Sequence, residues 1–504
     1  MTKQQLIQLT RRCVAVFCFL SMPVFAAEKP AEDAAPNIIL LMGDDHGWEE
    51  TGYNGHPQLQ TPVLDEMART GLRLDRFYAA HPSCSPTRGS VLTGRHPNRY
   101  GTFAPGRSIR PQEITIANVA GSAGYATAHF GKWHLGPVKA GSPTNPGAMG
   151  FDEWFSHDNF FELDPHLSRN GGPPIRYEGE GSKIVIDDAI RFISESTKQD
   201  KPFLAVVWFG SPHEPYSGLA EDLALYDNLP EKFADTTVSL TSNETGLRVK
   251  RPLRDVLRER YAEITAMDRA IGDLRKYLDR EGLRDNTMLW YCGDNGTPPS
   301  GLAESPLRGM KGQMYEGGIR VPGVIEWPAR ISEARTAAVS SVTSDMLPTI
   351  CELVNQPLPD RPLDGVSIID LIDGNMKTRP QPIGFWSFAS GDRGEQPYLD
   401  PKVQEGTTPL VKLMRGIATR NFRNDHHPSI IDKDYQGERT ILDDRYKLLI
   451  SKQGETQLYD LNEDPAETQN LVTSKPAIAT KMKQQMRQWQ TSVLNSLMES
   501  DYSK

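Results

Sequence analysis

Cysteine and long hydrophobic runs are scarce in this sequence of 504 residues. Of the five cysteines, Cys13 and Cys18 lie in the first 26 residues, and the remaining three are too few for a disulfide framework. The apolar run at residues 13–20 is far shorter than the ~20 residues that cross a bilayer, so no membrane span is expected. Acidic residues outnumber basic ones, giving a net charge of −9. This charge argues against nucleic acid or an anionic membrane as a partner.

The first 26 residues have the pattern of a secretory signal peptide. A basic start, an apolar centre and a small-residue cleavage pattern follow one another there. We expect cleavage near Ala26, export to the periplasm or the exterior, and a flexible leader over residues 27–36. The basic residues are Lys3, Arg11 and Arg12, the apolar centre is residues 13–20 and the cleavage pattern is residues 24–26.

Three continuous apolar runs, at residues 37–42, 203–209 and 287–292, predict strands buried on both faces of a parallel sheet. Amphipathic helical patterns lie between them. This alternation predicts an α/β fold: a large, mostly parallel, doubly wound sheet flanked by helices. Short strand-like segments near the C-terminus predict a smaller α+β domain with a short antiparallel sheet. We place the main domain at residues 37–375 and the smaller one at residues 376–504.

Polar side chains follow these three strands and a shorter predicted strand at residues 126–129, at the strand ends where ligands bind in a doubly wound sheet. The two acidic pairs contain oxygen donors without nitrogen or sulfur neighbours, which suits Ca²⁺ or Mg²⁺ and not zinc. One such pair alone would be read as a turn or a helix cap, but two pairs at two strand ends favour a cation site. The residues in question are Asp44 and Asp45, Lys132 and His134, His213, and Asp294 and Asn295.

The segment at residues 84–95, CSPTRGSVLTGR, contains the third cysteine. Pro86 suits the first turn of a helix, which would put Cys84 beside a helix N-terminus and near Arg88. That environment stabilises anions, so the residues by themselves indicate a nucleophilic cysteine with a lowered pKa. Cys292 and Cys351 lie in apolar patterns and are expected to be buried.

This segment resembles the signature of the type I, formylglycine-dependent sulfatases of the alkaline phosphatase superfamily. Further segments match the family in order along nearly the whole mature chain. Two positions depart from the family pattern, Thr87 where Ser or Ala is usual and Glu50 where many members have Asp. The other matching segments are TPVLDEMARTGLRLDRFY, GYATAHFGKWHLG, SPHEPY, YAEITAMDRAIGDL, GDNG, MKGQMYEGGIRVP and QLYDLNEDPAETQNL.

The resemblance implies a catalytic role for the main domain and a chemistry for each site residue. Cys84 would be oxidised to formylglycine by a maturation enzyme, and its hydrate would attack sulfur. One divalent cation, Ca²⁺ with Mg²⁺ as the alternative, would be bound by Asp44, Asp45, Asp294, Asn295 and the modified residue 84. The other implied roles are orientation of the diol by Arg88, neutralisation of sulfate by Lys132 and Lys311, assistance to the leaving oxygen by His213, and proton removal by His134.

Three functions from different classes fit these motifs. The first is hydrolysis of a sulfate ester, with a sulfated carbohydrate as substrate. The second is hydrolysis of a phosphonate monoester or phosphodiester with the same nucleophile, since that branch of the superfamily can share the formylglycine signature. The third is a non-catalytic protein that binds sulfated glycans. The combination of GKWHLG with the Lys311 segment favours the first.

Selectivity for the leaving group is expected from loops outside the shared pocket. In the first of these loops, His157, Asp158 and Asn159 are candidates for binding sugar hydroxyls, the alternative being solvent contact. The loops span Phe155–His166, Tyr216–Leu253 and Phe385–Asp432; the aromatic candidates for stacking on a sugar ring are Trp154, Phe160 and Phe161, of which at least two are expected to pack in the core instead.

Overall fold

The first strand, β1 (Asn37–Gly43), lies between two apolar layers, which explains why its sequence is continuously apolar. In the computed structural model, which describes residues 35–242, 247–389, 395–409 and 419–502, both faces of this strand are covered. Ile38 and Leu40 pack into one apolar layer, and Ile39 and Leu41 pack into another on the opposite face. Strand side chains alternate between faces, so a strand between two layers must be apolar at every position.

The main sheet has ten strands in the order β14-β2-β13-β11-β1-β8-β4-β5-β6-β7. The central five strands, from β11 to β5, are parallel, and β13, β6 and β7 pair antiparallel to their neighbours. The predicted α/β class is therefore confirmed. The remaining bounds are β2 (Leu72–Leu74), β4 (Ala126–Lys132), β5 (Glu153–His157), β6 (His166–Arg169), β7 (Ile175–Arg176), β8 (Phe203–Trp208), β11 (Thr287–Gly293), β13 (Gly323–Glu326) and β14 (Arg335–Ala337).

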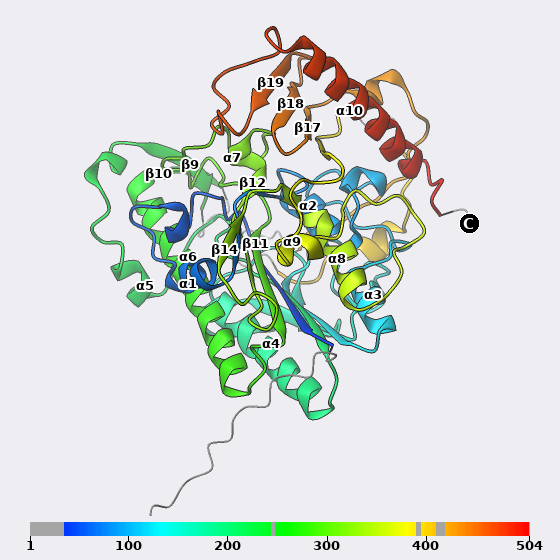
Figure 1. Cartoon of the computed structure of the whole chain (residues 1–504). Helices are drawn as coiled ribbons and strands as arrows, with labels where there is room; N and C mark the ends of the chain where they lie inside the picture. The colour runs from blue at the N-terminus through cyan, green and yellow to red at the C-terminus, as the bar shows by residue number, and fades with distance from the viewer. Residues whose placement is uncertain (1–34, 243–246, 390–394, 410–418, 503–504) are drawn as a thin grey trace, which may run out of the picture. The chain divides into compact units, whose positions relative to one another are not determined.

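Helices cover both faces of this sheet (Figure 1). One apolar layer contains side chains of α2 (Cys84–Thr93), α3 (Ile116–Ser122), α8 (Met346–Leu353) and α9 (Ile369–Ile372). The opposite layer contains side chains of the helices α1 (Pro62–Thr70), α4 (Gly181–Lys198) and α6 (Leu253–Arg280). The shorter elements are α5 (Ala220–Ala224), α7 (Glu316–Ile319), the hairpin of β9 (Thr237–Thr241) and β10 (Arg248–Pro252), and the small sheet of β3 (Phe77–Tyr78), β12 (Arg320–Val321) and β15 (Ser341–Val342).

A second, antiparallel sheet lies near the C-terminus, in the order β16-β17-β18-β19. The helix α10 (Pro476–Leu497) packs on one of its faces (Figure 1). The other face packs on Tyr78, Met314 and Ile319 of the main part of the chain. The predicted short antiparallel sheet is present, whereas the domain boundary at residue 375 stays a prediction. The strands are β16 (Ile383–Trp386), β17 (Arg439–Leu442), β18 (Tyr446–Ile450) and β19 (Thr456–Asp460).

Two predicted bounds change. Strand β4 extends to Lys132, three residues beyond the apolar run from which it was predicted, so Lys132 is the last residue of a strand. Helix α2 begins at Cys84 and not at Pro86. The predicted signal peptide, residues 1–26, lies outside the described residues, and none of the helices that are described has the length and apolarity to span a bilayer.

Candidate active site

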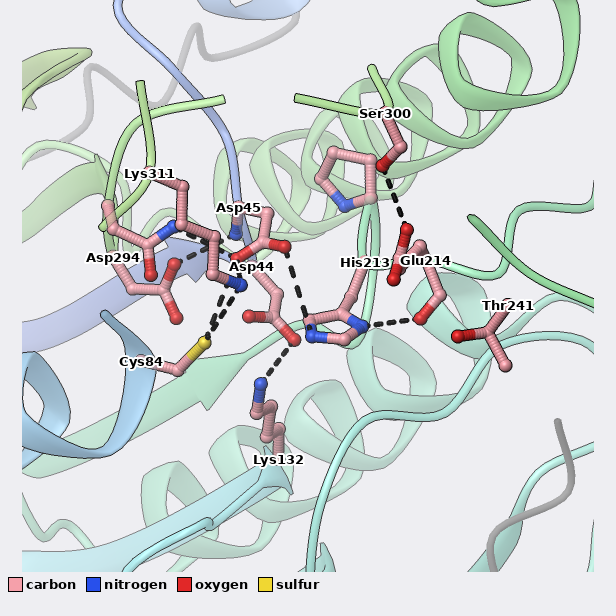
Figure 2. Close-up of polar contacts among 12 residues, drawn as sticks. Asp44, Asp45, Cys84, Lys132, His213, Glu214, Thr241, Asp294, Ser300 and Lys311 are labelled. Carbon is pink, nitrogen blue, oxygen red and sulfur yellow. Dashed lines mark hydrogen bonds and ion pairs between the residues drawn. The ribbon is translucent and has the colours of Figure 1, made fainter. Parts of the chain in front are cut away.

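Four neighbouring parallel strands bring the predicted site residues to one edge of the main sheet. In the order β11-β1-β8-β4, the strands are followed by Asp294, by Asp44, by His213 and, at the end of β4, by Lys132 and His134. The carboxyl ends of parallel strands share an edge, so residues up to 250 positions apart meet there. Figure 2 shows the side chains of Asp44, Lys132, His213 and Asp294 gathered around those of Cys84 and Lys311.

The acidic residues are fixed by bonds among themselves. The backbone N–H of Asp45 donates to Asp294 Oδ1 at 2.8 Å, and Asn295 Nδ2 donates to Asp45 Oδ1 at 2.9 Å. Asp45 has a φ of 64°, in the left-handed region, which turns its side chain back beside Asp44. Among the described residues, no hydrogen-bond partner reaches the buried oxygens Asp44 Oδ1, Asp45 Oδ2 and Asn295 Oδ1.

Three cations face these acids. Lys132 Nζ lies 2.5 Å from Asp44 Oδ2, Arg88 Nη2 lies 2.8 Å from Asp294 Oδ2, and Lys311 pairs with Asp45. Burial by itself would raise the pKa of Asp44, but the nearby positive charges, led by Lys132, bring that pKa well below its usual value. Burial and the charge of Asp44 raise the pKa of Asp294 to about 7. The cluster is therefore a dense set of opposed charges in a dry environment.

Cys84 is the first residue of α2 and is buried at the centre of this cluster. Its Sγ lies 3.5 Å from Lys311 Nζ and 3.7 Å from Asp45 Oδ1. The expectation of a lowered pKa is wrong: burial raises the pKa of the Cys84 thiol far above its usual value, and the opposing fields of Lys132 and Lys311 do not reverse this. As an ordinary thiol, residue 84 is a poor nucleophile at neutral pH.

His213 and His134 both lie at the site and differ in their contacts. His213 Nε2 is 3.8 Å from Asp45 Oδ2, and its Nδ1 is 2.6 Å from the carbonyl oxygen of Glu214, which orients the ring (Figure 2). Burial lowers the pKa of His213 to about 3 despite the charges of Asp45 and Asp44. Burial, followed by the charge of Lys132, lowers the pKa of His134 well below its usual value. Both rings are therefore neutral at pH 7.

The side-chain exposure shows from which side a substrate reaches the cluster. The side chains of Asp44, Arg88 and Lys132 are fully buried, whereas 16% of His213 and 21% of Lys311 is exposed. The open side of the cluster is therefore the side of His213 and Lys311.

A ligand atom from each of Asp44, Asp45, Cys84 and His213 lies within 4.8 Å of the others, a spacing compatible with one metal ion. The three carboxylate and amide oxygen atoms that lack a hydrogen-bond partner among the described residues suit a hard cation such as Ca²⁺ or Mg²⁺.

Arg260 is a part of the site that the sequence analysis missed. From α6, its guanidinium donates to the carbonyl oxygens of Asp45 and Pro212, both at 2.6 Å, and to Glu50. One buried arginine thus holds together the loop with the acidic pair and the loop with His213. Its partner Glu50 is a position where the chain departs from the family pattern. The available signal was a charged residue on the buried face of an amphipathic helix, which is rare without a buried partner.

The three residues of the loop Phe155–His166 that were predicted to bind sugar hydroxyls differ in their contacts. His157 Nε2 lies 3.1 Å from the carbonyl oxygen of Pro409, and the Asp158 carboxylate accepts backbone N–H groups, including that of Val138 at 2.7 Å. The contacts of both residues therefore support the loop, and their role in binding sugar hydroxyls stays a prediction. In Asn159, which is buried, neither amide atom has a hydrogen-bond partner among the described residues.

Of the three aromatic residues considered for stacking on a sugar ring, two pack in the core, as expected. Phe161 belongs to the apolar layer under α4, and Trp154 packs against the opposite layer with its Nε1 donating to Val138. Phe160 lies at the site instead, with its ring stacked on His213.

Comparisons with known proteins agree with this arrangement. A family model described as Sulfatase matches residues 36–356. The ulvan-active sulfatase of Formosa agariphila is 31% identical over 361 residues, covering 69% of this chain and 67% of the relative. The N-acetylgalactosamine-6-sulfatase of Mus musculus is 29% identical over 385 residues, covering 68% of each protein. The crystal structure of Ps i-CgsB has the same fold, with a TM-score of 0.72, 22% identity and coverage of 91% of this chain and 93% of that one.

Proposed function

The chain belongs to the sulfatase family and is a sulfuric ester hydrolase, and we propose that its substrate is an O-sulfated carbohydrate. The observation that carries the proposal is the position of Cys84, whose sulfur lies 3.5 Å from Lys311 Nζ and 3.7 Å from Asp45 Oδ1. The residue that would be converted to the nucleophile thus lies beside both a cation for the sulfate oxygens and a ligand for a metal. The name of one relative, N-acetylgalactosamine-6-sulfatase, supports a sugar as the substrate class.

We propose that Asp44, Asp45, Asp294 and Asn295 hold Ca²⁺ together with the modified residue 84. The donors are all oxygen atoms, and Asp44 Oδ1, Asp45 Oδ2 and Asn295 Oδ1 are buried without a hydrogen-bond partner among the described residues. Ca²⁺ accepts more oxygen ligands and a looser geometry than Mg²⁺, which remains the alternative. A divalent cation supplies positive charge that lowers the pKa of a neighbouring hydroxyl group.

We propose that residue 84 is converted to formylglycine, as the resemblance of residues 84–95 to the family signature implies. Burial raises the pKa of the Cys84 thiol, which argues against the unmodified side chain as the nucleophile. A formylglycine-generating maturation enzyme would act on the chain, and the hydrated aldehyde supplies one hydroxyl to attack sulfur and another through which sulfate is expelled.

The surrounding residues would orient the groups and move protons. Lys132 and Lys311 neutralise the sulfate oxygens, an electrostatic role like that of an oxyanion hole. Arg88 orients residue 84 from one side. His213 Nδ1–H donates to the carbonyl of Glu214, so Nε2 carries no proton and can take the one that the attacking hydroxyl loses. The same Nε2 would then pass this proton to the leaving oxygen. His134 is neutral and can accept the proton of the remaining hydroxyl, which releases sulfate and restores the aldehyde.

Export is part of the proposal. The N-terminal pattern supports a signal peptide that is cleaved near Ala26 and a mature protein in the periplasm or outside the cell. N-terminal sequencing of the mature protein tests this, with a start near residue 27 as the expected result.

Turnover of 4-nitrophenyl sulfate and of a phenylphosphonate monoester tests the reaction class. We expect the larger kcat/KM for the sulfate; a larger value for the phosphonate would favour the second function, and no turnover of either would favour a binding protein. Cys84→Ala is expected to abolish turnover, while Cys351→Ala, a buried cysteine on α8, serves as the matched control. Mass spectrometry of the peptide containing residue 84 should find the aldehyde. A panel of sulfated sugars with known sulfate positions identifies the substrate.

A further inference from the structure

The segments at residues 404–409 and 419–425 lie directly over the turn that contains His134. The carboxylate of Asp158 accepts the backbone N–H groups of Thr407 and Thr408 at 2.5 and 2.8 Å, and its carbonyl accepts the N–H of His134 at 3.2 Å. The ring of Phe422 lies edge-on to His134, with centroids 6.2 Å apart. One aspartate and one aromatic ring therefore fix these C-terminal segments to the edge of the active site.

Arg420 lies in this layer, two residues before Phe422. Its guanidinium rests over Gly106, where a Cβ atom would lie 3.1 Å from Nη2 and 3.5 Å from Nε. Its carbonyl oxygen packs against Gly406, where a Cβ atom would lie 2.3 Å from that oxygen and 2.8 Å from Asp158 Oδ2. A side chain at Gly406 would clash with the backbone oxygen of Arg420, and Gly106 has a φ of 87°, which favours glycine. The chain therefore passes close to Arg420 on both sides.

The guanidinium of Arg420 lacks the carboxylate partner that several buried arginines have. Arg88, Arg260 and Arg379 each pair with a carboxylate, whereas Arg420, which is partly buried, forms no hydrogen bond or ion pair with another described residue. A partly buried charge without a partner is costly. Burial lowers the pKa of Arg420, and the field of Cys84 acts in the opposite direction; Arg420 also contributes to the lowered pKa of His134. The guanidinium of Arg420, which has no partner among the described residues, is therefore near enough to Cys84 and His134 to act on both electrostatically.

The positions of the cations favour a ligand of Arg420 other than the sulfate that is cleaved. Lys132 at the end of β4, Arg88 on α2 and Lys311 in the loop before α7 already pair with the acidic cluster. Arg420 approaches from the C-terminal segments instead, on the side of His134. Its planar fork suits a carboxylate or a sulfate group.

We propose that Arg420 binds a second anionic group, a carboxylate or a further sulfate ester, of the same sugar whose sulfate is removed. This inference rests on the proposed function and narrows its substrate class to sugars with two negative charges. It makes Arg420 a specificity-determining residue that acts on the substrate and not on the proton transfers.

Three sets of sugars with the sulfate to be cleaved at the same position test this inference. The first has no other charge, the second has a uronic acid carboxylate and the third has a second sulfate group. The measured quantity is the ratio of kcat/KM for each doubly charged sugar to kcat/KM for the singly charged one. We expect Arg420→Gln to lower this ratio by about 10–100-fold, since hydrogen bonds to charged groups contribute about 1.5–3 kcal/mol. Whether the carboxylate or the sulfate arm loses more identifies the anion.

Arg423→Gln is the matched control, because Arg423 is on the same segment with 61% of its side chain exposed. We expect the Arg423→Gln control to retain the wild-type ratio. The Arg420→Lys variant keeps the positive charge without the planar guanidinium, so we expect it to lose part of the ratio. An Arg420→Gln enzyme with the wild-type ratio in both arms would overturn the inference, as would an equal loss in the control. If the wild-type enzyme released sulfate from no sugar in any set, the proposed substrate class would fail instead.

Discussion

The ring of Phe160 is stacked on the ring of His213, with centroids 4.3 Å apart and planes inclined by 11°. The stack and the contact between His213 Nδ1 and the carbonyl of Glu214 together fix the imidazole with Nε2 toward the acidic cluster. Phe160 follows the end of β5, while His213 follows β8, so the contact joins two loops of the sheet edge.

Replacement of Phe160 by leucine tests this contact. An aromatic pair contributes about 0.5–1.5 kcal/mol, so we expect kcat/KM to fall by up to about tenfold through a less well-oriented His213. Phe160→Tyr keeps the ring and should retain most of the activity. Equal kcat/KM in the leucine variant and the wild type would mean that the stack does not orient His213.

Removal of His213 should affect substrates according to their leaving groups. The loss of a general acid or base costs ~10²–10⁴ in rate, and a sugar alkoxide needs its help more than a nitrophenolate does. We expect His213→Ala to reduce kcat on a sulfated sugar far more than on 4-nitrophenyl sulfate. The assignment to the leaving oxygen would fail if both substrates slowed equally.

Removal of the cation should inactivate and destabilise the protein, because the buried oxygen atoms of the acidic cluster then lose the ion that would bind them. A cation at 100 times its Kd stabilises the folded state by about 2.7 kcal/mol. We expect chelation to lower the unfolding temperature and to abolish sulfate release, with Ca²⁺ restoring both. Asp45→Asn should weaken the Ca²⁺-dependent shift in unfolding temperature.

The matched control for this experiment is Asp222→Asn, since Asp222 is a buried carboxylate that pairs with Arg269 away from the site. Its Ca²⁺-dependent shift should equal that of the wild type. A shift of the same size in the Asp45→Asn variant would contradict a cation at the acidic cluster.

Lys447 joins the C-terminal sheet to the segment that follows Lys311. It is fully buried, and its Nζ lies 2.9 Å from both Glu316 Oε1 and Glu467 Oε1. Loss of one partner from a buried ion pair costs about 3–5 kcal/mol, so Lys447→Met should lower the unfolding temperature by several degrees. Lys452→Met, an exposed lysine of the same region, should have little effect. A comparable loss in both variants would show that the buried ion pairs do not stabilise this contact.

Glu467 makes the stability of this contact depend on pH. Burial and the charge of Glu316 raise the pKa of Glu467 to about 7, despite the opposing charge of Lys447. The folded state therefore binds this proton more tightly than the unfolded state, whose glutamate has an ordinary pKa near 4.5. Its contribution to the free energy of unfolding decreases as the pH rises from about 4.5 to 7.

Unfolding temperatures measured between pH 4.5 and pH 8 test this predicted decrease in stability with rising pH. Glu467→Gln should remove part of the decline with rising pH, whereas Glu455→Gln, an exposed glutamate before β19, should leave the profile unchanged. An unchanged slope in the Glu467→Gln variant would show that this carboxyl group does not titrate in the range.

Much of the site could be predicted because its signals are local. Each strand is an apolar run that ends at a polar turn, and the turn follows directly in the sequence, as with Gly43, Asp44 and Asp45. The residues that were missed lie outside the strand-end motifs, and the one signal for Arg260 was a charge on the buried face of a helix. Arg260 lies in the middle of a 28-residue helix, and Arg420 lies in a segment without regular structure.

The amino-acid sequence by itself determined which residues end strands, the presence of two acidic pairs and the motif around Cys84, because apolar periodicity and turn chemistry act between near neighbours. Only the tertiary structure decided the strand order that puts Asp294 beside Asp44, the raised pKa of Cys84 and the position of Arg420 near His134. Each of these depends on burial and on charges brought together from distant parts of the chain, which only the packed structure defines.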